Sequence, residues 1–168
     1  MQTKECIRSR RSVRGYNDSI VDYDVVEKLV ADATLAPSGM NRQPWKFLIL
    51  SDKEKIEKIA SFSASQSEWI KTAQYLLFVF LDRSSSYNEE RDLMAIGAAI
   101  ENFMLSAYDE GIGSCWLGGI LSNTCEILDI IDFNNQDCLI KAIITVGKYD
   151  PSETIAKRKP LEDVLIKK

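Results

Sequence analysis

Three short segments of the sequence carry residue types that bind charged or flat ligands. The first, Arg8 to Arg14, holds four arginines among seven residues. A guanidinium presents a rigid fork of N–H donors that suits phosphate oxygens, and a serine hydroxyl such as that of Ser12 adds a short hydrogen bond. The composition therefore indicates an anion-binding segment, with a solvated basic face as the alternative.

The second segment runs from Ala36 to Trp45 and contains two prolines, a glycine and an asparagine. These residues favour a rigid loop. Such a loop could present Ser38, Asn41 and Gln43 as oriented donors and acceptors toward the polar edge of a ring. The alternative is a helix end followed by a simple turn.

The third segment, Gly111 to Gly119, has four glycines in nine residues. Glycines let a backbone approach a flat ligand closely and direct bare N–H groups at it. The segment lacks the Gly-x-Gly-x-x-Gly order of a dinucleotide fold and the Lys-Ser/Thr ending of a phosphate loop. Taken alone, it is typical of a helix end and a turn.

The composition restricts the chemistry. The 168 residues include no histidine, which excludes Ser-His-Asp and Cys-His nucleophiles and every histidine-ligated metal site. None of the four cysteines (Cys6, Cys115, Cys125 and Cys138) forms a Cys-x-x-Cys pair, so we expect no metal site. An enzyme with this sequence must rely on carboxylates, lysine, cysteine or a cofactor.

The charge balance and hydropathy limit the partners and the location. With 21 basic and 25 acidic residues the net charge is −4, which argues against a nucleic-acid-binding surface. A local patch over Arg8 to Arg14 is kept as a minor hypothesis. No apolar run is long enough to span a membrane. The first residues have no apolar signal core, so we expect a cytoplasmic location.

Helices are predicted from apolar periodicity. Val26, Leu29, Val30 and Ala33 have the spacing of one face of an amphipathic helix, and Ser51 with Glu54 forms a capping box before another helix. The strongest helix spans about Asp92 to Glu110 and is apolar around most of its girth, so we expect it to be buried on several sides. Gly111 suits the position just after its end. A short helix is predicted after residue 122.

Three apolar runs predict strands: Trp45–Leu50, Tyr75–Leu81 and Leu139–Val146. The last two are apolar on both faces, which is typical of central strands covered by helices. The order helix, helix, strand, helix, strand, long helix, helix, strand indicates an α+β or α/β fold with a small mixed sheet. We expect a single domain over residues 1–168, with a tail from about residue 149 extending over a surface.

Taken together, the segments resemble the FMN-dependent nitroreductase family in its short form. The resemblance rests on four motifs in register over nearly the whole chain: Arg10-Arg11-Ser12-Val13-Arg14, Pro37-Ser38 through Asn41-Arg42-Gln43-Pro44-Trp45, Gly111 through Gly119, and Arg158-Lys159-Pro160-Leu161. It implies an α+β fold, a three-layer α/β/α sandwich with a small mixed sheet. It also implies an intertwined homodimer in which the tail of about 149–168 extends onto the partner subunit.

The resemblance implies FMN as cofactor and a set of residues around it. Arg10 and Ser12 would bind the phosphate and ribityl side, and Arg14 the N1 and O2 edge of the ring. The backbone N–H of Gly118 would face N5. The full set implied to bind the cofactor is Arg10, Arg11, Ser12, Arg14, Pro37, Ser38, Gly39, Asn41, Gln43, Leu117, Gly118, Gly119, Arg158 and Lys159, with residues 37–43 reaching the flavin from the other subunit and Lys157 a possible substitute in the tail.

The implied activity is transfer of hydride from NADH or NADPH through flavin N5 to a nitroaromatic, a quinone or a similar small acceptor. No catalytic side chain is needed, since the flavin carries the redox chemistry. A flavin carrier or sensor without turnover, and another flavin reaction on the same scaffold, are the alternatives.

The sequence also departs from the family pattern. Between Asp82 and Arg91 it has only a short polar loop where larger members carry a helical insertion over the flavin, so we expect a more open flavin face. A further polar flavin contact has three candidates, Ser65, Gln66 and Ser67. Cys115 is expected to be a buried packing residue, with a redox role as the alternative. Trp45 and Trp116 are expected to be core residues, with stacking on a substrate as the alternative.

Overall fold

The computed structural model describes residues 2–151 and 157–166. The helices are α1 (Thr3–Ser9), α2 (Tyr23–Thr34), α3 (Lys53–Ala60), α4 (Ser67–Ile70), α5 (Glu89–Asp109) and α6 (Thr124–Ile130). The strands are β1 (Trp45–Leu50), β2 (Tyr75–Asp82), β3 (Gly113–Leu117) and β4 (Cys138–Gly147). Short 3-10 turns, η1 (Gly39–Asn41), η2 (Leu121–Asn123) and η3 (Leu161–Asp163), lie between or after them. The three predicted strands are confirmed, and β3 is additional to them.

The four strands form one sheet in the order β1-β2-β4-β3. All three pairings are antiparallel, so the expectation of a mixed sheet is wrong for the described residues. Apolar periodicity predicts which residues form strands, but it carries no signal for the direction in which two distant strands pair. The central strands β2 and β4 are the apolar runs expected to be covered on both faces, and every residue of β2 is buried.

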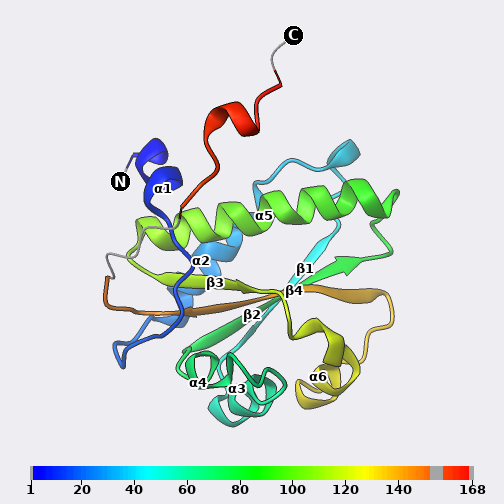
Figure 1. Cartoon of the computed structure of the whole chain (residues 1–168). Helices are drawn as coiled ribbons and strands as arrows, with labels where there is room; N and C mark the ends of the chain where they lie inside the picture. Colours follow the sequence, from blue (N-terminus) through cyan, green and yellow to red (C-terminus); the bar gives the residue numbers. More distant parts are fainter. Residues whose placement is uncertain (1, 152–156, 167–168) are drawn as a thin grey trace.

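Alternation along β2 divides the interior into two cores. Leu77, Val79 and Leu81 face one core, and Leu76, Phe78 and Phe80 face the other, because successive side chains point to opposite faces of a strand. Helices α2 and α5 cover the first face, and α3, α4 and α6 the second (Figure 1). The predicted three-layer α/β/α arrangement is therefore confirmed.

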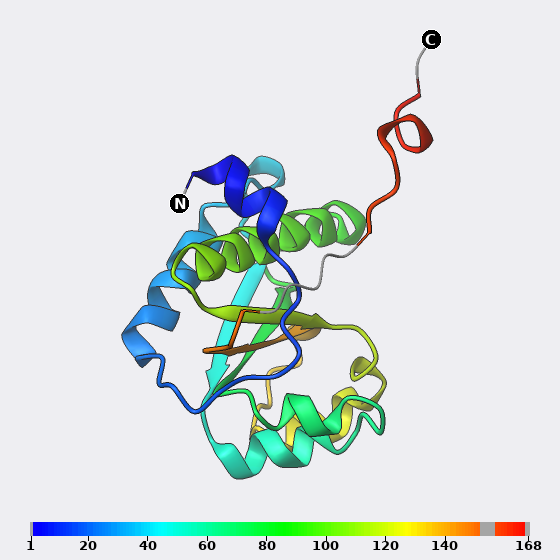
Figure 2. The same ribbon diagram turned by 60° about the vertical axis from the view of Figure 1, so that its left-hand side comes forward.

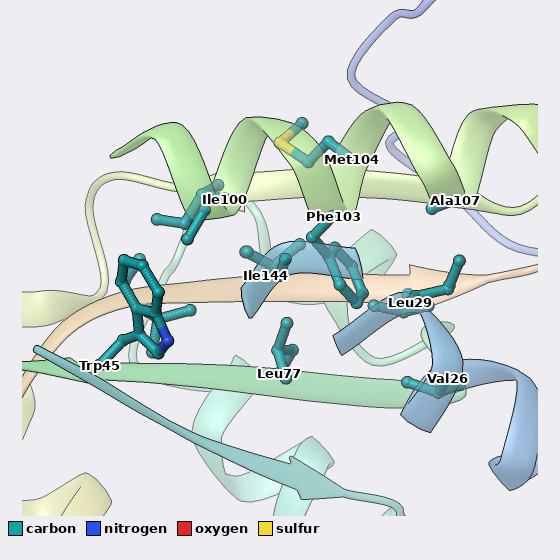
Figure 3. Close-up of a cluster of buried hydrophobic side chains, with 14 of the residues drawn as sticks. Val26, Leu29, Trp45, Leu77, Ile100, Phe103, Met104, Ala107 and Ile144 are labelled. Atoms are coloured by element: carbon teal, nitrogen blue, oxygen red, sulfur yellow. The ribbon is translucent and has the colours of Figure 1, made fainter. Parts of the chain in front are cut away.

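The core between α5 and the sheet is continuous. In Figure 3, side chains from α2, α5 and the sheet converge in one cluster: Val26, Leu29, Trp45, Leu77, Ile100, Phe103, Met104, Ala107 and Ile144. Trp45 is one of its members and is only 6% exposed, as expected of a core residue. The described helices include none that is long and apolar enough to cross a bilayer.

Helix α5 ends where the sequence predicts. Gly111 has a φ of 64°, which suits a residue without a side chain. The Gly111 N–H donates to the Tyr108 carbonyl at 3.1 Å and the Ile112 N–H to the Ala107 carbonyl at 2.8 Å. These two bonds form a Schellman motif, which satisfies carbonyls that the helix end leaves open. The chain is thereby turned back directly into β3.

The two ends of the chain lie outside the layers. After α1 the chain runs from Arg10 toward Asn17 across the side of the sheet at β3 (Figures 1 and 2). Residues 157–166 extend away from the body. Four apolar side chains of this tail are exposed, namely Leu161, Val164, Leu165 and Ile166.

Candidate functional site

The arginine-rich segment lies along the outer edge of β3. Strand β3 pairs with β4 only, so its second edge is open to other chain segments. The Val13 N–H donates to the Ser114 carbonyl at 3.0 Å on that edge. Gly113 lets the chain pass closely, since a Cβ there would lie 2.9 Å from Cγ1 of Val13. The segment is therefore fixed against the sheet in an extended conformation.

Arg10, Ser12 and Arg14 share one side of this segment. Their common neighbour is the thiol of Cys115, which is 2% exposed. Burial raises the pKa of Cys115, while the charge of Arg14, a hydrogen bond from Ser12 and the charge of Arg10 act in the opposite direction. Arg10, Ser12 and Arg14 stand at every second position, and residues at this spacing in an extended chain share one side.

The guanidinium of Arg10 has a charged partner at Nε and no hydrogen-bond partner at Nη1. Its Nε lies 3.4 Å from Oε1 of Glu101 on α5, and the Arg10 side chain is 16% exposed. Its Nη1 is buried and has no hydrogen-bond partner. A buried N–H donor without a partner is costly, so this atom fits an anionic ligand such as a phosphate.

Gln66 supplies a second buried polar atom without a hydrogen-bond partner. It lies at the N-terminal boundary of α4, and its Oε1 is buried without a hydrogen-bond partner. Of the three predicted candidates for a further polar contact, Ser65 is exposed and Ser67 is half-buried. A buried acceptor of this kind suits an N–H group on a bound ring.

Arg11 is held by main-chain carbonyls. Its Nη1 donates to the carbonyls of Arg8 and Arg10, both at 2.8 Å. It lines a pocket of about 190 Å³ together with Tyr108 and Tyr149. Ser12 and Arg14 line the same pocket, so Arg11 lies beside two of the other predicted site residues.

The loop from Pro37 to Gln43 is rigid, as predicted. Ser38 Oγ accepts a hydrogen bond from the Gln43 N–H at 2.9 Å, and the Ser38 carbonyl accepts one from the Asn41 N–H at 3.0 Å. Met40, Asn41 and Gln43 have φ values of 51°, 54° and 49°. Three non-glycine residues in the left-handed region are unusual, and such conformations are concentrated at functional sites.

Within one chain this loop lies apart from the arginine segment. It borders a groove of about 260 Å³ whose lining is Pro37, Ser38, Gly39, Arg91, Met94, Ala95 and Ala98. Figure 1 shows η1 in this loop beside the end of α5 that is remote from α1.

The main chain directly after β3 is exposed. The Leu117 side chain is 1% exposed and belongs to the core, so only its main chain could meet a ligand. Gly118 and Gly119 are exposed, and open space lies where a Cβ would be. Trp116 is 46% exposed, which contradicts the expectation of a core residue, because it lies near the end of the edge strand β3, whose other residues are buried.

The tail residues Lys157, Arg158 and Lys159 are exposed. Within the described ranges, none of the hydrogen bonds or ion pairs of residues 10–14 involves Arg158 or Lys159. Residues 152–156 and 167–168 of the predicted tail lie outside the described residues.

Several residues that shape the site have no sequence motif of their own. Tyr16 and Thr145 tie the arginine segment to the sheet, Glu101 pairs with Arg10, and Tyr87 contacts Gly39. Tyr16 could have been suspected from its place two residues after Arg14. The other three depend on contacts between distant segments, for which the sequence contains no local signal.

The nitroreductase family model matches residues 7–68 and 62–148 of the chain, and the chain belongs to this family. A candidate NADH dehydrogenase/NAD(P)H nitroreductase from Archaeoglobus fulgidus is 34% identical over 119 residues, covering 68% of each chain. A candidate NAD(P)H nitroreductase from Streptococcus pyogenes is 29% identical over 98% of both chains.

The fold is similar to solved structures of the family. A crystal structure from Desulfovibrio desulfuricans, described as a candidate nitroreductase in complex with FMN, superposes with a TM-score of 0.90. It is 30% identical in sequence, and the match covers 99% of this chain and 96% of that one. The resemblance based on four sequence motifs is therefore confirmed at the level of family and fold.

Proposed function

We propose that this chain is an FMN-dependent oxidoreductase that uses NADH or NADPH to reduce a nitroaromatic, a quinone or a similar small acceptor. The observation that carries the proposal is the Arg10, Ser12 and Arg14 group at the edge of β3, with the open Nη1 of Arg10. The open Oε1 of Gln66 and the FMN in the Desulfovibrio desulfuricans structure support it.

Each residue has a distinct proposed task. Arg10 and Ser12 hold the phosphate and ribityl side, where charge-assisted hydrogen bonds are strong. Arg14 lies at the N1 and O2 edge, where its positive charge stabilises the reduced ring. Gln66 accepts from the polar edge of the ring. Gly118 and Gly119 leave the main chain bare beside it, with the Gly118 N–H toward N5.

FMN, when bound, supplies the chemistry of hydride uptake and electron transfer. The protein residues bind and orient the ring, and they set the charge around it. No side chain acts as acid or base in this proposal, and the last proton comes from water. The chain's lack of histidine is compatible with this division of tasks.

We propose further that the working form is a homodimer with the flavin between the chains. The exposed side chains of Leu161, Val164, Leu165 and Ile166 form an apolar patch that a second chain would cover. On α5, Leu93 and Met94 are exposed. A partner that covers these surfaces also brings its Pro37 to Gln43 loop to the flavin, and the tail of about 149–168 with Arg158 and Lys159 to its phosphate.

The visible spectrum of the purified protein tests the cofactor. Bound flavin gives absorption bands at about 370 and 450 nm, and these bands should persist after gel filtration. Anaerobic mixing with NADH or NADPH should bleach the 450 nm band. A protein that stays colourless after addition of FMN contradicts the proposal. Flavin that binds but is not reduced by either nicotinamide points to a carrier or sensor instead.

Light scattering coupled to gel filtration tests the dimer. A mass near 38 kDa, twice the 19.0 kDa of one chain, is expected. Leu161→Asp/Leu165→Asp should reduce it to the monomer mass and release FMN, whereas Ile20→Asp, at an equally exposed apolar residue in the loop before α2, should not. A monomeric parent that retains FMN contradicts the interface proposal.

A further inference from the structure

The loop between β2 and α5 is short but strongly fixed. Two buried carboxylates bracket it. Asp82, 5% exposed, accepts hydrogen bonds from the main chain and hydroxyl of Ser84 at 3.0 and 2.5 Å and from the Ser85 hydroxyl at 3.1 Å. A loop tied at this many points has little freedom to move.

The second carboxylate fixes the other half of the loop. Asp92 is 1% exposed. Its Oδ2 accepts hydrogen bonds from the Ser86 hydroxyl at 2.7 Å and from the main-chain N–H groups of Tyr87 and Asn88 at 3.1 and 3.2 Å. The backbone of Tyr87 is therefore anchored to the first turn of α5.

The ring of Tyr87 lies directly on Gly39. A Cβ at position 39 would be 2.1 Å from the Tyr87 hydroxyl oxygen and 2.6 Å from Cε1 and Cζ. Real Cβ atoms do not approach other atoms this closely. The φ of Gly39 is not in the left-handed region, so the need for glycine here comes from the phenol ring and not from the backbone.

We propose that Tyr87 is a positioning residue for the Pro37 to Gln43 loop, and that the pair of Tyr87 and Gly39 sets how this loop meets the flavin. The inference rests on the proposed function, in which the loop contacts FMN. Asp92 holds the backbone of Tyr87, the Tyr87 ring supports Gly39, and the main chain at Gly39 is directly bonded to Ser38. A short loop thus fixes a neighbouring loop where a longer insertion is absent.

A cycle of substitutions tests this coupling, with the FMN dissociation constant as the readout. Gly39→Ala should weaken FMN binding about tenfold, because the new methyl group and the ring cannot occupy the same space. Tyr87→Ala should weaken FMN binding less, since it removes only the ring that supports Gly39. In Gly39→Ala/Tyr87→Ala the methyl group has room, so FMN binding should return to the level of Tyr87→Ala.

Tyr87→Phe is the matched control. It removes only the hydroxyl, and the ring carbons still lie 2.6 Å from the Cβ position. Gly39→Ala/Tyr87→Phe should therefore remain defective where Gly39→Ala/Tyr87→Ala is restored. The melting temperature of each apoprotein separates an effect on FMN from an effect on folding. If Gly39→Ala does not fold, recovery of folding by Tyr87→Ala and not by Tyr87→Phe tests the same contact.

The outcomes separate this inference from the proposed function. A parent that binds no FMN overturns the proposed function and the inference with it. A parent that binds FMN overturns the inference alone in either of two cases: Gly39→Ala binds FMN as tightly as the parent, or the loss in Gly39→Ala is the same with Tyr87→Ala as without it.

Discussion

The hydroxyl of Tyr16 lies 2.6 Å from Oγ1 of Thr145, joining residues 129 positions apart in the sequence. Thr145 is fully buried, and its hydroxyl can also donate to the Cys115 carbonyl at 3.3 Å. The Tyr16 hydroxyl can also donate to the carbonyls of Val13 and Thr145, at 3.1 and 3.2 Å. The ring of Tyr16 lies against Gly147, where a Cβ would be 2.9 Å from Cδ1. Burial raises the pKa of Tyr16, which keeps the phenol a neutral donor. This pair ties the arginine segment to the two strands beside it.

Tyr16→Phe tests that connection. The variant keeps the ring and removes the hydrogen bond between the Tyr16 hydroxyl and the buried Thr145 hydroxyl, so the free energy of unfolding should fall by about 1–2 kcal/mol. FMN should also bind more weakly, because Arg14 is two residues away. Urea unfolding of the apoprotein and an FMN titration measure the two effects.

The double variant Tyr16→Phe/Thr145→Val is the companion measurement. It removes both polar groups, so its loss of stability should be smaller than the sum of the two single losses. Additive losses would mean that the two hydroxyls are not coupled.

The sequence predicts the fold where burial alone decides the structure. Tyr75 to Leu81 is apolar at every position, and Leu139 to Val146 is apolar except at Lys141 and Thr145; both form the central strands. Strand β3 was not predicted, because its glycines and short length are typical of a turn and only pairing with β4 makes it a strand. The cap of α3 was misplaced by one residue: Asp52, not Ser51, accepts from the Lys55 N–H.

The site was predictable where its residues belong to one local motif. Alternating Arg10, Ser12 and Arg14 belong to one local motif, so their shared side follows from an extended chain. The position of Arg11 was not predictable, because its hydrogen bonds to nearby carbonyls depend on the turn after α1. The contact of Tyr87 with Gly39 joins residues in separate loops, and no local pattern encodes it.

Asp82 gives the protein a pH-dependent element. A hydrogen bond from the Ser84 hydroxyl is the main cause that lowers the pKa of Asp82, with further bonds and the Lys46 charge adding to it against the effect of burial. A carboxyl with a lowered folded pKa contributes stability that is complete above its unfolded value of about 3.9 and is lost as the pH falls through the folded value. Stability should therefore decrease on acidification below about pH 4.

Asp82→Asn should reduce this acid dependence, and it should lower stability near neutral pH. Urea midpoints of parent and variant at about pH 7 and pH 3 measure the difference. Glu89→Gln is a useful comparison, because the Glu89 side chain, which pairs with Lys141, is 60% exposed and this ion pair should contribute little. Equal acid dependence in Asp82→Asn and the parent would contradict the role of Asp82.

Arg10→Ala and Ser12→Ala separate the two proposed phosphate contacts. Loss of a charge-assisted bond should weaken FMN binding by about tenfold to a hundredfold for Arg10, and loss of a neutral hydroxyl by less than about tenfold for Ser12. The dimer should remain folded in both. Arg8→Ala, which removes an exposed arginine on α1, is the control and should retain FMN as the parent does. Parent-like flavin occupancy in Arg10→Ala would refute the assignment.

Arg14 should act on the redox potential more than on retention. Burial raises the pKa of both Cys115 and Tyr16, and the charge of Arg14 acts against this rise, so Arg14 acts electrostatically at the edge of β3. If the same charge stabilises the negative edge of the reduced ring, Arg14→Ala should make the flavin potential more negative. Arg14 is exposed and its field is screened, so an effect of about 1 kcal/mol is expected, equivalent to about 20 mV for two electrons.

Arg14→Lys keeps the charge and distinguishes electrostatics from geometry. Its potential should lie between those of the parent and Arg14→Ala, because the ammonium retains the positive charge but loses the planar fork of donors. Equilibration with a reference dye during slow enzymatic reduction measures all three potentials. Identical potentials in the parent and Arg14→Ala would exclude Arg14 from the N1 and O2 edge, and equal potentials in both variants would assign its effect to the guanidinium geometry instead of the charge.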